Sequence, residues 1–187
     1  MALPAPVPAT YRLTFEDWLR FPDDGKLYEI IGGELFVGPS PSWRHQLIGT
    51  ELLFRLRTFL GSGSRGRVAA APAGVRLSDE DVVEPDLVVI LAEHRERIDE
   101  SSVAGTPDLV VEILSPGTAG RDLRVKRALY ERSGIPEYWI VDPAAETIQV
   151  LALAEGAYRE AGLYRSDQTL TSPLLPGLEI QLAQIFL

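Results

Sequence analysis

Two acidic residues stand in apolar runs whose pattern predicts buried β-strands. Glu112 is the only charged residue of residues 109–114, and burying a lone carboxylate is costly unless a cation or hydrogen-bond donors compensate it. Asp86 begins a second apolar run directly after Pro85, and proline is common at strand ends. If the strands are neighbours, about 4.8 Å apart, both carboxylates can share one hard cation such as Mg²⁺ or Mn²⁺. The alternative is two separate acids paired with arginines.

Asp108 competes with Asp86 for this role. It lies four residues before Glu112 on the same predicted strand, which corresponds to about 13 Å at about 3.3 Å per residue. That separation is too long for one shared ion. We therefore prefer Asp86 as the partner of Glu112, and expect Asp108 to start the strand and cap a turn.

Lys126 is a candidate for the cationic group. Of the 18 Lys and Arg residues, only Lys26 and Lys126 are lysine. On a predicted helix Lys126 shares a face with Leu123 and Tyr130, at spacings of three and four, so its stem can pack towards the sheet with its ammonium near the acids. There it would position an attacking water, support its deprotonation and stabilise transition-state charge. The alternative is a surface lysine whose stem lies along the protein.

The N-terminal part of the chain predicts a flexible lead-in, a short helix and a β-hairpin. Residues 1–12 are predicted to be a flexible lead-in, followed by a short helix over residues 16–19. The runs 27–31 and 34–37 flank Gly32-Gly33, a pair typical of a tight hairpin turn because both positions favour positive φ. We expect an N-terminal β-hairpin.

The middle of the chain predicts a long helix followed by three strands. Ser42 is a cap residue, apolar residues then recur at helical spacing, and Gly61 ends the pattern. The runs 68–77, 82–91 and 108–114 have strand composition, and the last two are nearly continuously apolar, as in strands buried on both faces.

The C-terminal part supplies a second helix and more strands. Residues 121–133 predict a helix that ends before Gly134, and residues 137–141 another buried strand. The tail 147–187 predicts a hairpin turning near Glu155-Gly156 and a final strand or short helix that extends or covers the sheet. The order predicts an α/β (α+β) fold with a central sheet.

The composition bounds the class of protein. A chain of 187 residues with 45% hydrophobic and 24% charged residues fits one globular domain, which we place at 13–187. Without cysteine, disulfides, thiolate metal sites and cysteine nucleophiles are excluded, and a reducing, cytoplasmic location is expected. We expect no secretory signal and no membrane span, because the longest apolar stretches fall far short of about 20 residues.

The net charge of −9 counts against broad electrostatic binding of nucleic acid. Two local groups of basic residues offset it, although they are equally compatible with ordinary solvated surface. These groups are Arg55, Arg57, Arg65 and Arg67, and Arg121, Arg124, Lys126, Arg127 and Arg132.

These residues occur within an ordered set of motifs that resembles a known family. The chain is similar, over about residues 28–186, to the Uma-type restriction endonuclease family of the PD-(D/E)XK nuclease superfamily. The resemblance is carried by Tyr28-Glu29, Gly33-Glu34-Leu35, Pro39-Ser40-Pro41 with His45, Pro85-Asp86-Leu87, Asp108-Leu109-Val110-Val111-Glu112-Ile113-Leu114-Ser115-Pro116, Asp122 with Lys126, and Glu137-Tyr138-Trp139-Ile140-Val141-Asp142-Pro143.

The resemblance implies a restriction-endonuclease-like core, with a central mixed sheet flanked by helices, an N-terminal hairpin and a C-terminal β extension. It implies that Asp86 and Glu112 bind a divalent metal, helped by the backbone carbonyl of Ile113, and that Lys126 is catalytic. The superfamily motif places its lysine two residues after the acid, where this chain has Leu114. The Uma-type variant takes the lysine from the following helix instead.

Glu34 and His45 also match the family pattern and are accessory candidates. Glu34 would add a metal or water contact and His45 would contact a phosphate, or either would orient the metal ligands. The alternatives are a glutamate of the hairpin turn and a histidine hydrogen-bonded in the core. We interpret Tyr138 and Trp139 as core and interface aromatics.

Together these observations predict a Mg²⁺- or Mn²⁺-dependent endonuclease that hydrolyses DNA phosphodiester bonds. One alternative is a nuclease-fold protein that no longer cleaves and serves as a binding or assembly module. Another is a hydrolase of a smaller phosphodiester, which fits the negative charge. A homodimer is expected, because the N-terminal hairpin and the C-terminal strands create sheet edges that need covering.

Overall fold

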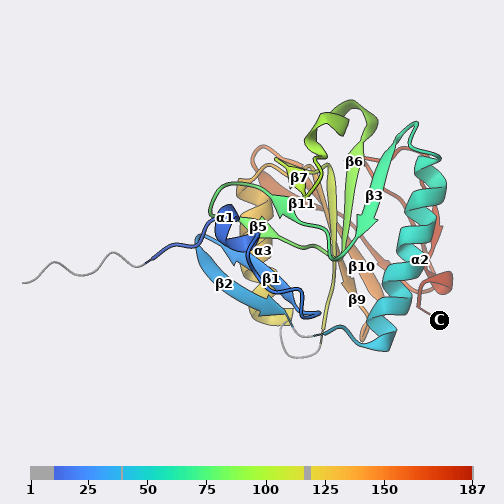
Figure 1. Cartoon of the computed structure of the whole chain (residues 1–187). Helices are drawn as coiled ribbons and strands as arrows, with labels where there is room; N and C mark the ends of the chain where they lie inside the picture. Colours follow the sequence, from blue (N-terminus) through green and yellow to red (C-terminus); the bar gives the residue numbers. More distant parts are fainter. Residues whose placement is uncertain (1–10, 39, 116–118, 187) are drawn as a thin grey trace, which may run out of the picture.

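The computed structural model describes residues 11–38, 40–115 and 119–186, without the side chains of residues 119–122 (Figure 1). Most of the expected lead-in, Pro39, Pro116 and the side chain of Asp122 lie outside these described residues. A six-stranded sheet forms the centre, and only its β8–β9 pair is parallel. Its strands in spatial order are β11 (Ala157–Arg165), β10 (Thr147–Ala154), β9 (Glu137–Asp142), β8 (Leu109–Ile113), β6 (Leu87–Leu91) and β3 (Gly66–Ala70).

A second sheet of five shorter strands carries the N-terminal hairpin. Its strands in spatial order are β2 (Glu34–Gly38), β1 (Leu27–Ile31), β5 (Val82–Val83), β4 (Val75–Arg76) and β7 (Val103–Ala104). The hairpin prediction is confirmed, since Ile31 pairs with Glu34 and the two turn glycines have φ of 58° and 75°. Glycine reaches these positive φ values without steric cost.

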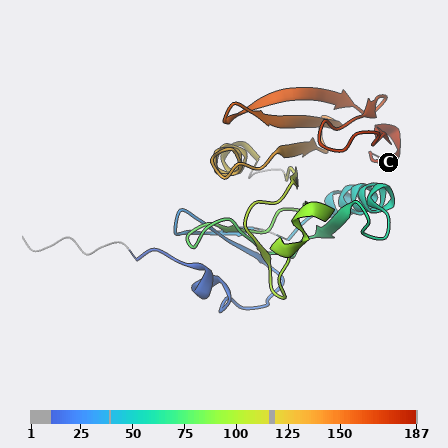
Figure 2. The same ribbon diagram turned by 90° about the horizontal axis from the view of Figure 1, so that it is seen from above.

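Two helices cover the faces of the central sheet around β6 and β8. The helix α2 (Trp43–Leu60) starts at Ser42, whose side chain accepts a hydrogen bond from the His45 N–H, and ends at Gly61. The helix α3 is Ala119–Arg132. Figures 1 and 2 show α2 and α3 on opposite sides of β6 and β8.

Side chains alternate along β8 between the two faces of the sheet. Leu109, Val111 and Ile113 pack with the buried residues of α2 in one hydrophobic cluster. Val110 packs with Leu129 and Tyr130 of α3 in another. The alternation therefore turns Glu112 towards α3.

Two of the predicted strands are wrong in extent. Residues 68–77 are divided between β3 and β4, and residues 82–91 between β5 and β6, so that each run serves both sheets. Pro72 and Pro85 lie at the crossings, where a residue without an N–H cannot continue the ladder of hydrogen bonds. Asp86 consequently stands where the chain enters the central sheet. The sequence interpretation also lacked β7 and the short helix η1 (Ala92–Arg97).

The C-terminal tail both extends and covers the central sheet. The β10–β11 hairpin turns at Glu155 and Gly156, with φ of 53° and 78°, as predicted. Beyond it, β12 (Thr169–Leu170), β13 (Ile180–Gln181) and η2 (Leu182–Gln184) contribute buried side chains to the cluster that includes α2. The short N-terminal helix is α1 (Phe15–Trp18), close to its predicted position. No helix among the described residues has the length and hydropathy needed to cross a membrane.

Candidate active site

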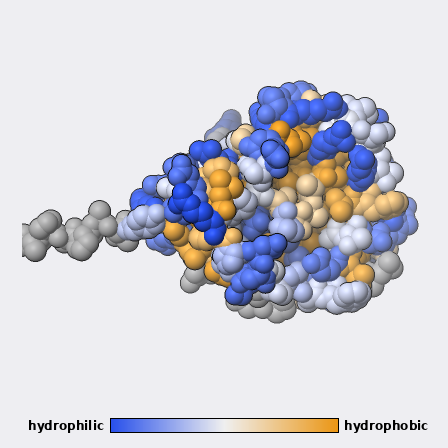
Figure 3. Space-filling view, viewed as in Figure 1, coloured by the Kyte–Doolittle hydropathy of each residue, from blue (hydrophilic) through white to orange (hydrophobic). Residues whose placement is uncertain are grey.

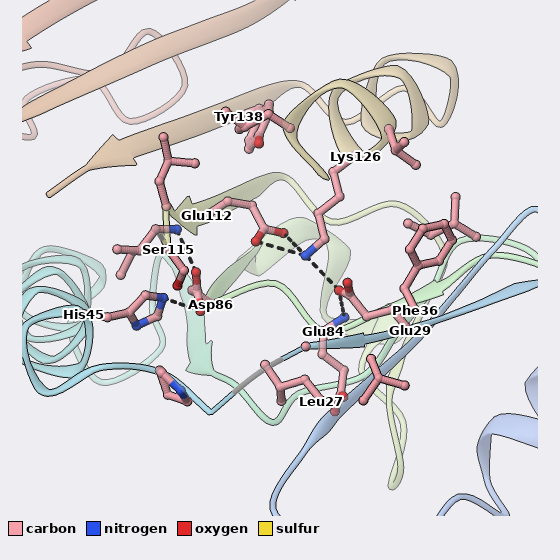
Figure 4. A pocket seen from close by; sticks show the side chains of 18 of the residues that line it. Leu27, Glu29, Phe36, His45, Glu84, Asp86, Glu112, Ser115, Lys126 and Tyr138 are labelled. Atoms are coloured by element: carbon pink, nitrogen blue, oxygen red, sulfur yellow. Dashed lines mark hydrogen bonds and ion pairs between the residues drawn. The ribbon is translucent and has the colours of Figure 1, made fainter. Parts of the chain in front are cut away.

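Asp86 and Glu112 lie side by side on adjacent strands. The antiparallel β6–β8 register pairs Leu87 with Val111. Asp86, directly before Leu87, and Glu112, directly after Val111, therefore lie at the same end of this strand pair. Both line a cavity of about 500 Å³, which we call the acidic hollow (Figure 4). Neither acid is paired with an arginine among the described residues, whose salt bridges connect Asp86 to His45 and Glu112 to Lys126. The structure thus brings the two predicted acids together on neighbouring strands.

Lys126 reaches Glu112 from α3. Its Nζ lies 2.9 Å from Oε1 and 3.0 Å from Oε2 of Glu112. One helical turn further on, the Tyr130 hydroxyl donates to Glu112 Oε1 at 2.6 Å. Only 14% of the Lys126 side chain is exposed, so the alternative of a surface lysine does not apply. The helix thus holds a cation and a hydroxyl over one carboxylate.

Glu29 and Glu84 complete the site, and the sequence interpretation assigned neither a role. Glu29, in β1, places its Oε1 2.9 Å from Lys126 Nζ and accepts the Glu84 N–H at 2.9 Å. Glu84 Oε2 accepts the Tyr28 N–H at 3.1 Å. Glu29 is the only charged residue of residues 27–31, so the signal that identified Glu112 could have marked it as a buried acid, whereas Glu84 lies between Asp81 and Asp86 and carries no such signal.

Asp86 is held by donors from both sides. The Ile113 N–H donates to Asp86 Oδ2 at 2.7 Å, and His45 Nε2 lies 3.3 Å from Oδ1. Burial alone would lower the pKa of His45, but its hydrogen bond to Asp86 and the negative charge there outweigh burial and raise the pKa. His45 Nδ1 is buried and has no hydrogen-bond partner in the described part of the chain. The contact of His45 with Asp86 is thus made through Nε2.

The electrostatic balance of the site is negative. Four carboxylates, those of Glu29, Glu84, Asp86 and Glu112, line the acidic hollow together with the ammonium of Lys126. Burial raises the pKa of Glu112 to about 7, with Asp86 and Glu29 adding to the rise and Lys126 opposing it. The pKa of Lys126 is raised by Glu112 and Glu29, although burial opposes the rise. The lysine is thus held as an ammonium, and the excess negative charge favours an additional cation.

The donor chemistry fits a hard divalent cation. Asp86 and Glu112 offer carboxylate oxygens, and Ile113 lines the same hollow, so its backbone carbonyl is a third candidate ligand. Oxygen ligands of this kind suit Mg²⁺ or Mn²⁺. Within the described ranges, no group of three or more acidic or histidine side chains is arranged to hold a metal ion. The fit therefore depends on two carboxylates together with main-chain oxygen.

Other predicted residues lie elsewhere. Glu34 is exposed at the hairpin turn and does not line the acidic hollow. Asp108 directly precedes β8, as expected, and its carboxylate accepts the Leu91 N–H at the end of β6 and contacts His94 Nδ1, each at 2.7 Å. Tyr138 and Trp139 are fully buried core aromatics, and Tyr138 also borders the acidic hollow.

A mixed sheet flanked by helices, with two acids at neighbouring strand ends and a lysine reaching them from a helix, is the arrangement of a restriction-endonuclease-like fold. The chain belongs to the Uma2 family, described as "Putative restriction endonuclease", which matches residues 15–183. This confirms the family predicted from the motifs.

A solved structure supports the fold. The chain is similar to a protein from Anabaena variabilis ATCC 29413 that is titled a "putative nuclease belonging to DUF820", with a TM-score of 0.77 and 19% sequence identity. The similarity covers 93% of this chain and 97% of that one. No curated protein matches the sequence. The predicted restriction-endonuclease-like fold is thereby confirmed.

Proposed function

We propose that the protein is a Mg²⁺- or Mn²⁺-dependent endonuclease that hydrolyses phosphodiester bonds of DNA. The observation that carries this proposal is the convergence of Asp86, Glu112 and Lys126 in one hollow. Membership of the Uma2 family and the nuclease-like fold support the reaction class.

Each residue has a role that follows from its contacts. Asp86, Glu112 and the Ile113 carbonyl would hold the cation, and His45 would orient Asp86 through Nε2. A bound divalent cation supplies positive charge that activates water and shields charge developing on the phosphate. Because the pKa of Lys126 is raised, its ammonium would position the water and stabilise negative charge in the transition state.

The test is a nicking assay on plasmid and on single-stranded DNA with Mg²⁺ or Mn²⁺. We expect Asp86→Ala and Glu112→Ala to lose about a hundred- to a thousandfold in rate. Glu34→Ala is the matched control, because Glu34 is exposed and outside the acidic hollow. Undiminished nicking by both site variants would show that this assignment is wrong.

A second candidate, a binding module that no longer cleaves, is favoured by one observation. Lys126 occupies both oxygens of Glu112, so the ammonium already neutralises a proposed metal ligand. Thermal melting with and without Mn²⁺ separates the two candidates, because a ligand that binds only the native state raises the melting temperature. A rise supports the metal-dependent enzyme, and an unchanged Tm at millimolar Mn²⁺ supports the module.

We further propose that the protein acts in the cytoplasm as a homodimer. The sheet edges at β2 and β11 support the dimer, because Leu35 and Val37 of β2 and Leu163 of β11 are about half exposed. Size-exclusion chromatography with light scattering should give twice the mass of 20.6 kDa. A monomer across micromolar concentrations would remove the dimer from the proposal.

A further inference from the structure

A second cavity adjoins the acidic hollow and shares part of its wall. It has a volume of about 430 Å³, and we call it the aromatic hollow. Leu27, His45, Glu84, Asp86 and Ile113 line both cavities. A phosphodiester held by the proposed cation beside Asp86 would therefore have one flank next to the aromatic hollow.

Aromatic side chains form one wall of this cavity. Trp18, Phe21 and Tyr28 line it, and each is half-buried. The Trp18 indole N–H donates to the Tyr28 carbonyl at 2.7 Å, and the Phe21 and Tyr28 rings lie 5.2 Å apart. These bonds and ring contacts fix the wall in place, and Figure 3 shows apolar surface between the N-terminal elements and α2. A fixed aromatic wall is suited to a flat, unsaturated ligand.

The opposite wall, on α2, carries two polar side chains without a hydrogen-bond partner among the described residues. Gln46 and Thr50 lie one helical turn apart and both line the aromatic hollow, with Gly49 between them. Neither side chain makes a hydrogen bond to any residue that the structure describes. A glutamine amide and a threonine hydroxyl can each donate and accept. This is the chemistry that reads the edge of a nucleobase.

Size and charge decide which form of nucleic acid fits. A cavity of about 430 Å³ falls within the roughly 300–1,000 Å³ of small-ligand pockets, so it can take one base and excludes a duplex. A base enters such a cavity only when it is unpaired or flipped out of its stack. The net charge of −9 also disfavours binding along many phosphates. Recognition through a single unpaired base avoids that repulsion.

We propose that the aromatic hollow binds the base of the nucleotide next to the phosphate that the cation at Asp86 and Glu112 would hold, with Gln46 and Thr50 determining base preference. This inference rests on the proposed function and deepens it, since it specifies single-stranded or locally unpaired nucleic acid as the substrate. The base lies against the wall of Trp18, Phe21 and Tyr28, and its polar edge faces α2.

The chain contains three tryptophans, which permit a direct test by ¹⁵N NMR of the whole protein without metal. Trp18 lines the aromatic hollow, Trp43 is 80% exposed outside it and Trp139 is buried in the core. The probes are the four deoxynucleoside 5′-monophosphates, with AMP to compare ribose and inorganic phosphate to isolate the anion. We expect the nucleotides to shift the Trp18 indole signal saturably and to leave the Trp43 signal in place.

Variants on the exposed face of α2 sharpen the test. Gln46→Leu and Thr50→Val should each weaken nucleotide binding about tenfold and reduce the differences among the four bases. Thr58→Val is the matched control, because Thr58 is exposed on the same helix and does not line the aromatic hollow. An unmoved Trp18 signal at millimolar nucleotide, an equal shift with inorganic phosphate alone, or wild-type binding by both variants would overturn the inference.

The two proposals fail in different ways. Saturable binding at Trp18 without Asp86-dependent cleavage would remove the nuclease and retain the nucleotide site. Asp86-dependent cleavage with no response at Trp18 would remove the nucleotide site and retain the nuclease.

Discussion

Glu112 and Glu137 are buried glutamates on paired parallel strands, yet their surroundings differ in kind. Glu137 begins β9 opposite Leu109, at the other end of the β8–β9 pair from Glu112. Its carboxylate accepts hydrogen bonds from Trp139 Nε1 at 2.7 Å, the Ser172 hydroxyl at 2.6 Å and the Leu174 N–H at 2.9 Å. These three neutral donors satisfy the charge and fasten the C-terminal tail to the sheet.

Glu112 has a cation and other acids around it instead. Lys126 and Tyr130 donate to it, Asp86 and Glu29 add negative charge, and it borders a cavity. The comparison teaches that a buried carboxylate alone does not mark an active site. An acid whose bonds are complete stabilises the fold, whereas one that shares a cavity with further acids retains capacity for a ligand.

The largest expected effect concerns the cation beside Glu112. Lys126→Met should lower the rate of DNA cleavage by about a hundred- to a thousandfold, because charge stabilisation in the transition state is lost. Initial rates of plasmid nicking measure it. Arg127→Met is the control, since Arg127 is the next residue of α3 and is exposed. A loss of equal size in both variants would locate the effect in the helix rather than in the ammonium.

The second prediction separates the two glutamates by metal binding. At a Mn²⁺ concentration about a hundred times the Kd, binding adds about 2.7 kcal/mol to the unfolding free energy. This corresponds to a Tm rise of roughly 5–10 °C for a chain of this size. Glu112→Gln should lose this Mn²⁺-induced rise in Tm. Glu137→Gln should show the full rise, although its Tm without metal should be lower than that of the wild type. A full rise in Glu112→Gln would contradict the assignment of Glu112 as a ligand.

The third prediction addresses the stabilising role of Glu137. In Glu137→Gln an amide NH₂ replaces one of the two carboxylate oxygens. This NH₂ faces either the Leu174 N–H or the Trp139 and Ser172 donors, so at least one buried donor loses its acceptor. We expect a loss of about 1–3 kcal/mol in unfolding free energy, or a Tm lower by roughly 2–12 °C. Chemical denaturation measures it, with Glu179→Gln, on the exposed side of the same tail, as control. Cleavage below the Tm should persist.

Much of the site could be predicted because it depends on local periodicity. A period of two places Glu112 on one face of β8, and a period near 3.6 places Lys126 and Tyr130 on one face of α3. Both inferences require only that the strand and the helix form. The pairing of β6 with β8, which brings Asp86 beside Glu112, was a hypothesis that the register confirms.

The parts that were missed depend on contacts between distant segments. Glu29 reaches Lys126 only because β1 belongs to a second sheet packed beside the first. No local pattern encodes that packing. The divided runs 68–77 and 82–91 have the same cause, since continuous strand composition does not reveal a change of sheet. Glu34, singled out by its motif, is the first residue of β2 and pairs with Ile31 across the turn, where it is exposed to solvent.

The smallest expected effect comes from a third carboxylate, that of Asp17, which is half-buried and lies outside both sheets. Asp17 accepts from the N–H and hydroxyl of Thr14 and from the Tyr11 hydroxyl, each at 2.9 Å. These bonds, the Thr14 N–H foremost, lower the pKa of Asp17 below its ordinary 3.8. A lowered pKa in the folded state means that the stabilisation is present above that ordinary value and is lost as the pH falls through the folded one.

Asp17→Ala should therefore lower the Tm at pH 7 by at most about 3 °C, and the difference from the wild type should narrow below about pH 4. Melting curves from pH 7 to pH 2.5 measure the effect, with Asp167→Ala as an exposed control far along the chain. Because Asp17 caps the helix that carries Trp18, its loss should also weaken nucleotide binding at the aromatic hollow while leaving Mn²⁺ binding unchanged. If Asp17→Ala also lost Mn²⁺ binding, the two hollows would not bind their ligands independently. The wall that contains Trp18 would then also hold the acids of the acidic hollow in position.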